Sequence, residues 1–285
     1  MYGQQILVDT LTQPVAMGKT GDAWQYHSRS DRHSKASCWG LLFDLLLACP
    51  VLQGHVKAGK VCFGINHEIR DFKQNRRKNL DLVICTPQKA SAGGKARTLE
   101  ELADQYGIVL SPAARKALKS APAIHEAPVG DVLVALEAKA CMTAHSKARP
   151  RLYDELNSSH QTVHGSSSEA LAAGLVVINF ADHFASPGRA GYCPKCGHRV
   201  SPVNPHKQPS DGVGVMDKVM QLPRRTKADE DGFDALAILA IDCKNDGSPV
   251  TLMPTPPAPS ASDIFNYGQC VSRLSQLFAT RFSHL

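Results

Sequence analysis

Hydrophobic positions in the first third of the chain change from helical to strand spacing. Apolar residues recur every three or four positions over 39–47, which predicts a helix over residues 34–49. Residues 60–69 then alternate β-formers with small or polar residues, and residues 80–85 form a short apolar run, so both segments are predicted strands. Residues 1–33 show no clear period and are interpreted as an irregular N-terminal arm.

Strand and helix patterns continue to alternate in the second part of the chain. Apolar runs at 131–139, 175–180 and 235–243 predict three further strands, the first two of them separated by a helix over 150–165. An amphipathic pattern over 263–282 predicts a closing helix. This order predicts an α/β fold with a central mixed sheet flanked by helices.

Three segments depart from this rhythm. Residues 88–128 contain two helix-start signals, at Thr98 and Ser111, and are interpreted as a helical insertion, with a sequence-reading helix-turn-helix as the alternative. Residues 186–212 are rich in Pro, Gly and Ser and are interpreted as a cysteine-containing loop or small module. Residues 254–285 comprise a stiff Pro-rich linker and the closing helix, whose apolar face is interpreted as a partner surface.

Composition narrows the class of protein. The 285 residues carry a formal net charge of +6 and are 43% hydrophobic, which is typical of a globular chain and compatible with a polyanionic partner. The longest apolar stretch is shorter than the roughly 20 residues of a membrane span, and the first residues do not form a signal peptide. Nine cysteines at irregular spacing favour reduced thiols, so we expect a cytoplasmic protein without a membrane partner.

The most informative side chains are two carboxylates and an ammonium on predicted strands. Asp81 lies in one strand, while Glu137 and Lys139 lie two residues apart in another and therefore share one face. Such groups in a buried sheet are costly unless they bind a cation or each other. Mg²⁺ prefers oxygen ligands of this kind, so the sequence predicts a magnesium site.

These motifs carry a family resemblance. The run Asn79-Leu80-Asp81, the run Glu137-Ala138-Lys139 and the order of predicted elements resemble the PD-(D/E)XK, or restriction-endonuclease-like, nuclease superfamily over residues 34–182. Leu80 stands where the family has proline, and the helical insertion lengthens the separation of the two motifs. The resemblance implies a restriction-endonuclease-like nuclease core, which we place at residues 34–253.

The resemblance also implies residue roles. Asp81 and Glu137 would be metal ligands with the Ala138 carbonyl as a third, and Lys139 would position or activate the attacking water. Family members often add an acidic residue from the first helix or strand, for which Asp44 is preferred over Glu68. The alternative for the charged strand is a non-catalytic ion pair of Glu137 with Lys139 or Lys147.

Two further groups of residues are candidates for binding. Cys193 and Cys196 have the spacing of a zinc hook, and His198 and His206 are the nearest residues that complete a Cys₂His₂ site; a reduced cysteine pair on a flexible loop is the alternative. Cations are candidates for a DNA-backbone groove, although a solvated turn or face is the more common explanation of such a charge run. These are Arg76, Arg77 and Lys78 in the basic segment 70–78, with Arg149, Arg151, Arg224 and Arg225.

The sequence therefore predicts a DNA endonuclease that depends on Mg²⁺ or Mn²⁺ and carries a candidate Zn²⁺ loop. The family resemblance implies a setting in bacterial restriction or anti-phage defence. Its expected partners are DNA and either a second copy, forming a homodimer, or a larger defence complex. The competing hypothesis is a non-catalytic, zinc-containing protein that binds nucleic acid or assembles a complex.

Overall fold

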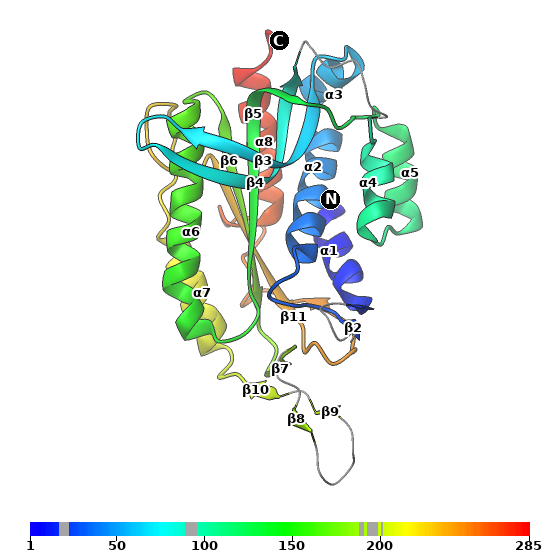
Figure 1. Cartoon of the computed structure of the whole chain (residues 1–285), viewed down its shortest axis with the longest axis vertical. Coiled ribbons are helices and arrows are strands. Elements are labelled where there is room, and N and C mark those ends of the chain that lie inside the picture. Colours follow the sequence, from blue (N-terminus) through cyan, green and yellow to red (C-terminus); the bar gives the residue numbers. More distant parts are fainter. Residues whose placement is uncertain (17–22, 89–95, 188–190, 193–198, 201) are drawn as a thin grey trace.

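A six-stranded mixed sheet forms the centre of the molecule, with the strand order β12-β11-β6-β5-β4-β3 (Figure 1). The computed structural model describes residues 1–16, 23–88, 96–187, 191–192, 199–200 and 202–285. The strands are β3 (Cys62–Asp71), β4 (Arg76–Pro87), β5 (Val129–Cys141), β6 (Leu171–Asn179), β11 (Ala235–Asp242) and β12 (Thr251–Leu252). Strands β5, β6 and β11 run parallel, and the other pairs are antiparallel. The predicted α/β class with a mixed central sheet is confirmed.

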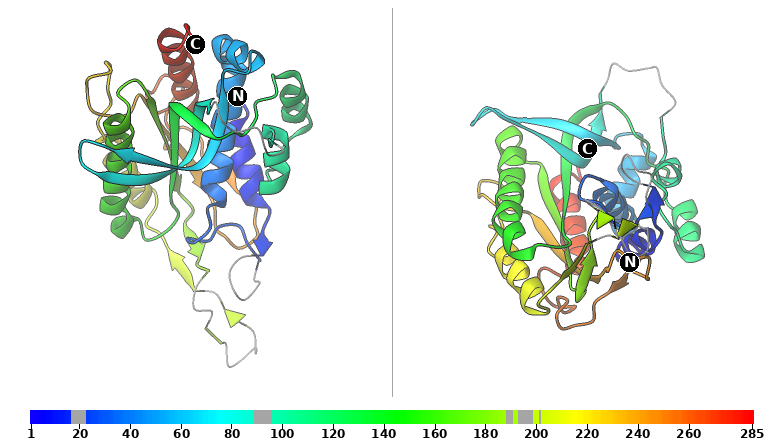
Figure 2. Two further views of the ribbon diagram at one scale, coloured as in Figure 1. Left: turned by 45° about the horizontal axis from the view of Figure 1, so that its top comes forward. Right: turned by 60° about the horizontal axis from the view of Figure 1, so that its bottom comes forward.

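Helices cover both faces of this sheet. One face is packed by α1 (Gly3–Thr12), α2 (Arg32–Ala48), α3 (Pro50–Lys57) and α8 (Tyr267–Arg281), and the other by α6 (His145–Ser166) and α7 (Ser210–Met220) (Figures 1 and 2). Strands β6 and β11 are buried along almost their whole length. Their continuous apolar sequences follow from this double coverage.

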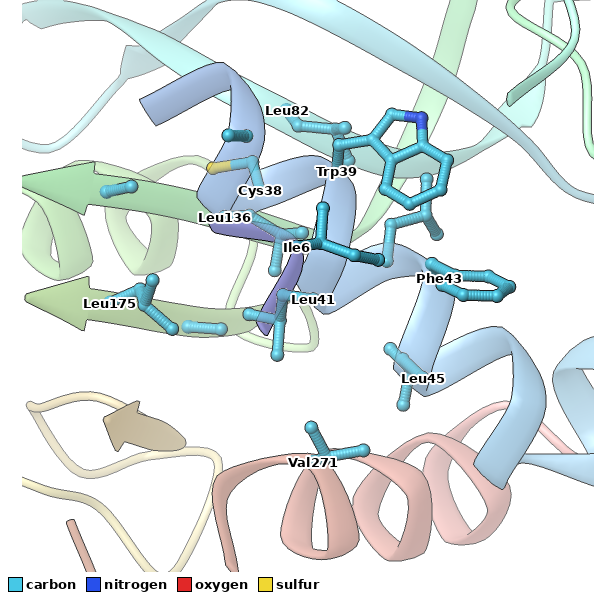
Figure 3. Packing of buried hydrophobic residues seen from close by; sticks show 14 of the residues in the cluster. Ile6, Cys38, Trp39, Leu41, Phe43, Leu45, Leu82, Leu136, Leu175 and Val271 are labelled. Atoms are coloured by element: carbon cyan, nitrogen blue, oxygen red, sulfur yellow. The ribbon is translucent and has the colours of Figure 1, made fainter. Parts of the chain in front are cut away.

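Helix α2 is buried nearly all round because it lies between the sheet and other helices. Its Cys38, Trp39 and Leu41 gather with Leu136 of β5 and Ile6 of α1 in one apolar cluster (Figure 3). The predicted insertion forms two helices, α4 (Leu99–Tyr106) and α5 (Pro112–Ser120), beside α2. A hydrogen bond of 2.8 Å from the Trp39 indole to the Leu99 carbonyl fastens the insertion to the core.

The prediction of an irregular arm over residues 1–33 is wrong for its first part. Residues 3–12 form helix α1, in which Val8 is buried and five further buried positions recur at helical spacing, namely Gly3, Ile6, Leu7, Thr10 and Leu11. Glycine and threonine occupy two of these five positions, which hides the period in a hydrophobicity pattern. The arm contains little further regular structure, namely β1 (Val15–Ala16) paired with β2 (Ala23–Trp24).

The apolar face of the closing helix is not a free partner surface. In α8, Tyr267, Val271, Leu274 and Phe278 are buried against the sheet and α2 within this chain. This overturns the observation on which the expected homodimer depended.

The cysteine-containing segment 186–212 includes regular secondary structure in its described parts and is not a plain loop there. Its described parts include β8 (Gly191–Tyr192), β9 (Arg199–Val200), β10 (Val203–Pro205) and the start of α7 at Ser210, and β10 pairs with β7 (His183–Ala185). Within the described ranges no single helix is both long and apolar enough to cross a membrane. Helices α2 and α3 pass that test together, but they meet at a bend of 96°.

Candidate active site

Strand pairing brings the two predicted carboxylates together. Strands β4 and β5 are paired as far as Leu82 and Leu136, so Asp81 and Glu137 are the next residues in the antiparallel register. Beyond this point a side chain replaces the backbone as hydrogen-bond acceptor. The Asp81 Oδ2 accepts a hydrogen bond of 2.9 Å from the Ala138 backbone N–H. The two predicted motifs therefore meet where β4 and β5 separate.

The pairing of β4 with its other neighbour, β3, is also interrupted at Asp81. Strand β3 pairs with β4 on either side of Asn66, which lies opposite Asp81 and has a left-handed backbone with φ of 48°. Asparagine tolerates this conformation better than most residues. The irregularity leaves Asp81 at an opening in the sheet on both sides.

Alternation along β5 then orients Glu137 and Lys139. Leu136 and Ala138 enter the core beside α2, whereas Glu137 and Lys139 share the opposite face as predicted. Lys139 Nζ lies 2.8 Å from Glu137 Oε1 and 3.8 Å from Glu155 Oε2 of α6. The ion pair of the non-catalytic alternative is thus present with Lys139, and the second cation close to Glu137 is Lys78 at 3.9 Å.

Burial changes the protonation behaviour of these groups. Burial raises the pKa of Asp81, and the Ala138 N–H and Lys139 offset part of that rise. Burial and then the nearby charge of Asp81 raise the pKa of Glu137, against the opposing effect of Lys139. For Lys139, burial lowers the pKa, but Glu137 and Asp81 together outweigh it and the pKa is raised. The two carboxylates repel each other, and the lysine holds its proton.

One oxygen of this site has no protein partner. Glu137 is only 3% exposed, and its Oε2 is buried without a hydrogen bond. A buried carboxylate oxygen without a partner is costly, and a bound cation would remove the cost. The Ala138 carbonyl points to the same side of β5 as its N–H, toward Asp81. This carbonyl and the two carboxylates are oxygen donors of the kind that Mg²⁺ prefers.

Three residues of the site, Asp31, Ser34 and Glu155, were missed in the sequence, and Lys78 was predicted only as a DNA-binding cation. Lys78 donates a 2.6 Å hydrogen bond to the Glu155 carbonyl, so α6 holds this lysine close to Glu137. Burial lowers the pKa of Lys78. Asp31 and Ser34, at the start of α2, line a cavity of about 10 Å³ together with Asp81, enough for about one water molecule. Nothing in the local sequence links these residues to Asp81, because the link is made by packing of helices on the sheet.

The proposed ligand Asp44 lies elsewhere. Its carboxylate is 2% exposed and accepts hydrogen bonds from the backbone N–H groups of Tyr2 and Gly3 and from the Tyr267 hydroxyl, at 2.7 to 3.0 Å. Asp44 therefore joins α1, α2 and α8 and is not a metal ligand. The other acidic candidate, Glu68, is exposed on β3 and pairs with Arg77.

The predicted DNA-binding cations separate into exposed and structural residues. Arg225 is 1% exposed and binds Asp234 and three backbone carbonyls, so the prediction for Arg225 is wrong. Arg224 is partly buried over the Phe265 ring. Arg151 is exposed and pairs with Glu155 beside the site, and Arg149 lies on the same turn of α6.

The predicted turn over residues 70–78 is a β-hairpin. Arg76, Arg77 and Lys78 belong to its second strand, β4. The side chain of Arg76 lies near Asp71 and Gln161, whereas Arg77 is exposed. Asp81 follows on the same strand, so these cations lead directly to the site.

Most of the candidate zinc site falls outside the described residues, since Cys193, Cys196 and His198 are not among them. His206 is described, and both of its ring nitrogens have partners, the Ala181 carbonyl at 2.9 Å and the Thr143 hydroxyl at 3.1 Å. In the described part of the chain, no three His, Cys, Asp or Glu side chains cluster as a ready-made metal site. The two carboxylates at β4 and β5 would need the Ala138 carbonyl and water to complete a coordination shell.

Comparisons with protein-family models, curated proteins and solved structures find no match to this chain.

Proposed function

We propose that this chain is a DNA endonuclease that hydrolyses phosphodiester bonds with Mg²⁺ or Mn²⁺. The observation that carries the proposal is the convergence of Asp81, Glu137 and Lys139 where β4 and β5 separate, with one buried oxygen of Glu137 left without a partner. A purely structural ion pair would not require a second, partly buried carboxylate that adds to the rise in the pKa of Glu137 caused by burial.

The order of elements around the site supports the same proposal. Helix α2, strands β3, β4 and β5, helix α6 and strand β6 follow one another as in the restriction-endonuclease-like core that the motifs resemble. Asp81 lies on the second of these strands, and Glu137 and Lys139 lie on the third. The proposed core thus includes all three proposed site residues.

Asp81, Glu137 and the Ala138 carbonyl would hold the metal ion. When bound, such an ion lowers the pKa of a water ligand and neutralises charge on the phosphate oxygens. Lys139 keeps its proton, so its ammonium group can stabilise the negative charge that develops on the phosphodiester during hydrolysis. Lys78 adds a second positive charge near Glu137. The positive charges would attract the phosphate backbone, and a bound cation would offset the repulsion between the carboxylates and the reacting phosphate.

Cleavage of supercoiled plasmid DNA tests the proposal. Wild-type protein is expected to nick or linearise the plasmid in Mg²⁺ or Mn²⁺ but not in EDTA. Asp81→Ala and Lys139→Ala are each expected to reduce the rate at least about a hundredfold. The first removes a proposed metal ligand, and the second removes the ammonium group proposed to stabilise charge on the phosphodiester. Lys147→Ala is the matched control, since this exposed lysine on α6 has no part in the site, and it should cut like wild type.

Two outcomes would contradict the proposal. Cleavage that survives both site substitutions would indicate a contaminating nuclease or another site. Retained DNA binding with no cleavage under any metal condition would favour the non-catalytic binding or assembly protein. The setting in bacterial restriction or anti-phage defence is part of the proposal only through the family resemblance.

A further inference from the structure

The hairpin of β3 and β4 carries an unusually exposed aromatic side chain. Phe72, in the turn between the strands, is 72% exposed, the largest fraction among the large hydrophobic side chains in the described ranges. The hairpin extends beyond the sheet and past α6, so its turn projects from the body of the molecule (Figures 1 and 2). Single exposed apolar residues are common, but this one stands among cations.

The turn is held rigidly. Asp71 is 1% exposed, and its Oδ1 accepts hydrogen bonds from the N–H groups of Lys73 and Gln74, at 2.9 and 3.0 Å. The strands remain in register up to the pair Asp71 and Arg76. The guanidinium of Arg70 lies 5.7 Å from the centre of the Phe72 ring, within the range of a cation–π contact. Phe72 is therefore presented on a fixed support.

Positive charges face each other on the outer side of the hairpin. Ile69 and Leu80 are buried among the residues on the side of α6, whereas Arg70 and Arg77 are exposed and lie directly opposite each other in the register. Like charges at directly opposed positions destabilise a strand pair. Glu68 offsets only part of this charge, through an exposed contact of 3.3 Å with Arg77. An anion between the two guanidinium groups would relieve the repulsion.

The same strand connects this charged surface to the candidate active site. Arg77 and Asn79 are exposed at alternate positions of β4, and Asp81 is the next residue in that alternation. Four residues of extended strand separate Arg77 from Asp81 by about 13 Å. A backbone bound along the hairpin would therefore continue toward Asp81 and Glu137.

We propose that the β3–β4 hairpin is the DNA-positioning arm of the enzyme, in which Arg70 and Arg77 bind backbone phosphates and Phe72 inserts between bases. This proposal rests on the proposed nuclease function. Arginine is suited to phosphate, and apolar side chains inserted from a protein separate neighbouring bases in a duplex. Phe72 and the arginines are thus positioning residues that hold the substrate at a fixed distance from the reacting groups.

Binding to a fluorescent duplex in EDTA, where cleavage is absent, tests the arm. The probe is a 25-base-pair duplex that carries 2-aminopurine, whose fluorescence rises when a neighbouring base is unstacked. Phe72→Ala should weaken binding about tenfold or more and abolish the fluorescence rise, whereas Phe72→Trp should preserve both. The double variant Arg70→Gln, Arg77→Gln should reduce the slope of log affinity against log salt by about 2. Lys116→Ala on α5 is the control and should behave like wild type.

The outcomes separate this inference from the proposed function. If wild type binds and cuts DNA but Phe72→Ala keeps its affinity and its fluorescence rise, the proposal of a DNA-positioning arm is wrong, whereas the proposed nuclease function is unaffected. If wild type neither binds nor cuts DNA, both proposals fall. Since Phe72 is mostly exposed, unchanged circular dichroism is expected for its variants, and any loss of binding then comes from the lost stacking contact.

Discussion

At the scale of single residues, Glu137 has two unlike oxygens. Oε1 is neutralised by Lys139 at 2.8 Å, whereas Oε2 is buried with no partner among the described residues. Folding alone gains little from such an arrangement, because a protonated or apolar side chain would avoid the cost of burying the charge. A bound cation, as in the proposed function, would remove that cost.

The raised pKa values lead to a prediction for metal-dependent stability. In the metal-free protein, the cost of ionising Asp81 and Glu137 is absent below their unfolded pKa of about 4 and develops as pH rises through the raised folded values. Mg²⁺ or Mn²⁺ should remove this cost and raise the melting temperature at about pH 8, and the rise should shrink toward about pH 5 as protons compete. Scanning fluorimetry across this pH range measures both effects.

Matched variants make this prediction specific. Asp81→Asn and Glu137→Gln should each lose the metal-induced rise in melting temperature. Glu68→Gln changes an exposed carboxylate outside the site and should keep it. An equal metal response in Glu137→Gln and wild type would mean that the ion binds elsewhere.

At the scale of elements, the junction of α1, α2 and α8 is built around one carboxylate and two glycines. Gly3 and Gly40 allow α1 and α2 to approach so closely that a Cβ on Gly40 would lie 2.8 Å from the Gly3 Cα. Asp44 accepts hydrogen bonds from the first residues of α1 and from Tyr267 of α8. The Asp44 carboxylate thus fixes two helices on a third.

Replacing Asp44 should therefore affect stability and not metal binding. Asp44→Ala is expected to lower the free energy of unfolding by about 3 kcal/mol or more, since three buried donors lose their acceptor. Asp9→Ala is the control, because Asp9 makes only an exposed contact with Gln5 and should change stability by about 0.5 kcal/mol or less. Urea unfolding measures both, and loss of the metal response in Asp44→Ala at unchanged stability would restore Asp44 as a ligand.

The elements that the sequence predicted correctly are those whose period is local. Strands β6 and β11 have continuous apolar sequences because both sides of the sheet are covered, and helix α2 is buried nearly all round. Helix α3 was not predicted because its first residue, Pro50, directly follows the helix predicted over residues 34–49. Proline ends a helix, but it also suits the first turn of a following one. Helix α1 was missed because one of its buried positions is Gly3, which allows close packing on α2 but does not appear in a hydrophobicity pattern.

In the candidate site, too, the sequence predicts local relations between residues but not long-range ones. Period-two alternation places Glu137 and Lys139 together from sequence alone. Asp81 lies beside them because of the register of β4 and β5. Lys78 and Glu155 lie nearby because α6 packs on the sheet there. Long-range packing also decides which acids are structural, which is why an acid on an apolar helix was mistaken for a ligand.

At the scale of the whole molecule, the closing helix belongs to the core. Phe278 is fully buried, and the Phe282 carbonyl lies 2.8 Å from the His55 ring of α3. Phe278→Ala should lower the free energy of unfolding by about 3 to 5 kcal/mol, whereas Ile264→Ala, at a residue 54% exposed, should change it by about 0.5 kcal/mol or less. Urea unfolding and sedimentation velocity measure stability and association. A change of oligomeric state without a change of stability in Phe278→Ala would identify a partner surface instead.

The hydrogen bond between Asp44 and Tyr267 also has a kinetic consequence. It joins residues 223 positions apart, and the closure of so large a loop is slow because its entropy must be lost before the contact forms. Until α8 docks, the apolar surface of β11 and α2 remains open to solvent. Refolding is therefore expected to pass through a collapsed, aggregation-prone intermediate. This intermediate persists until α8 docks and covers the apolar surface.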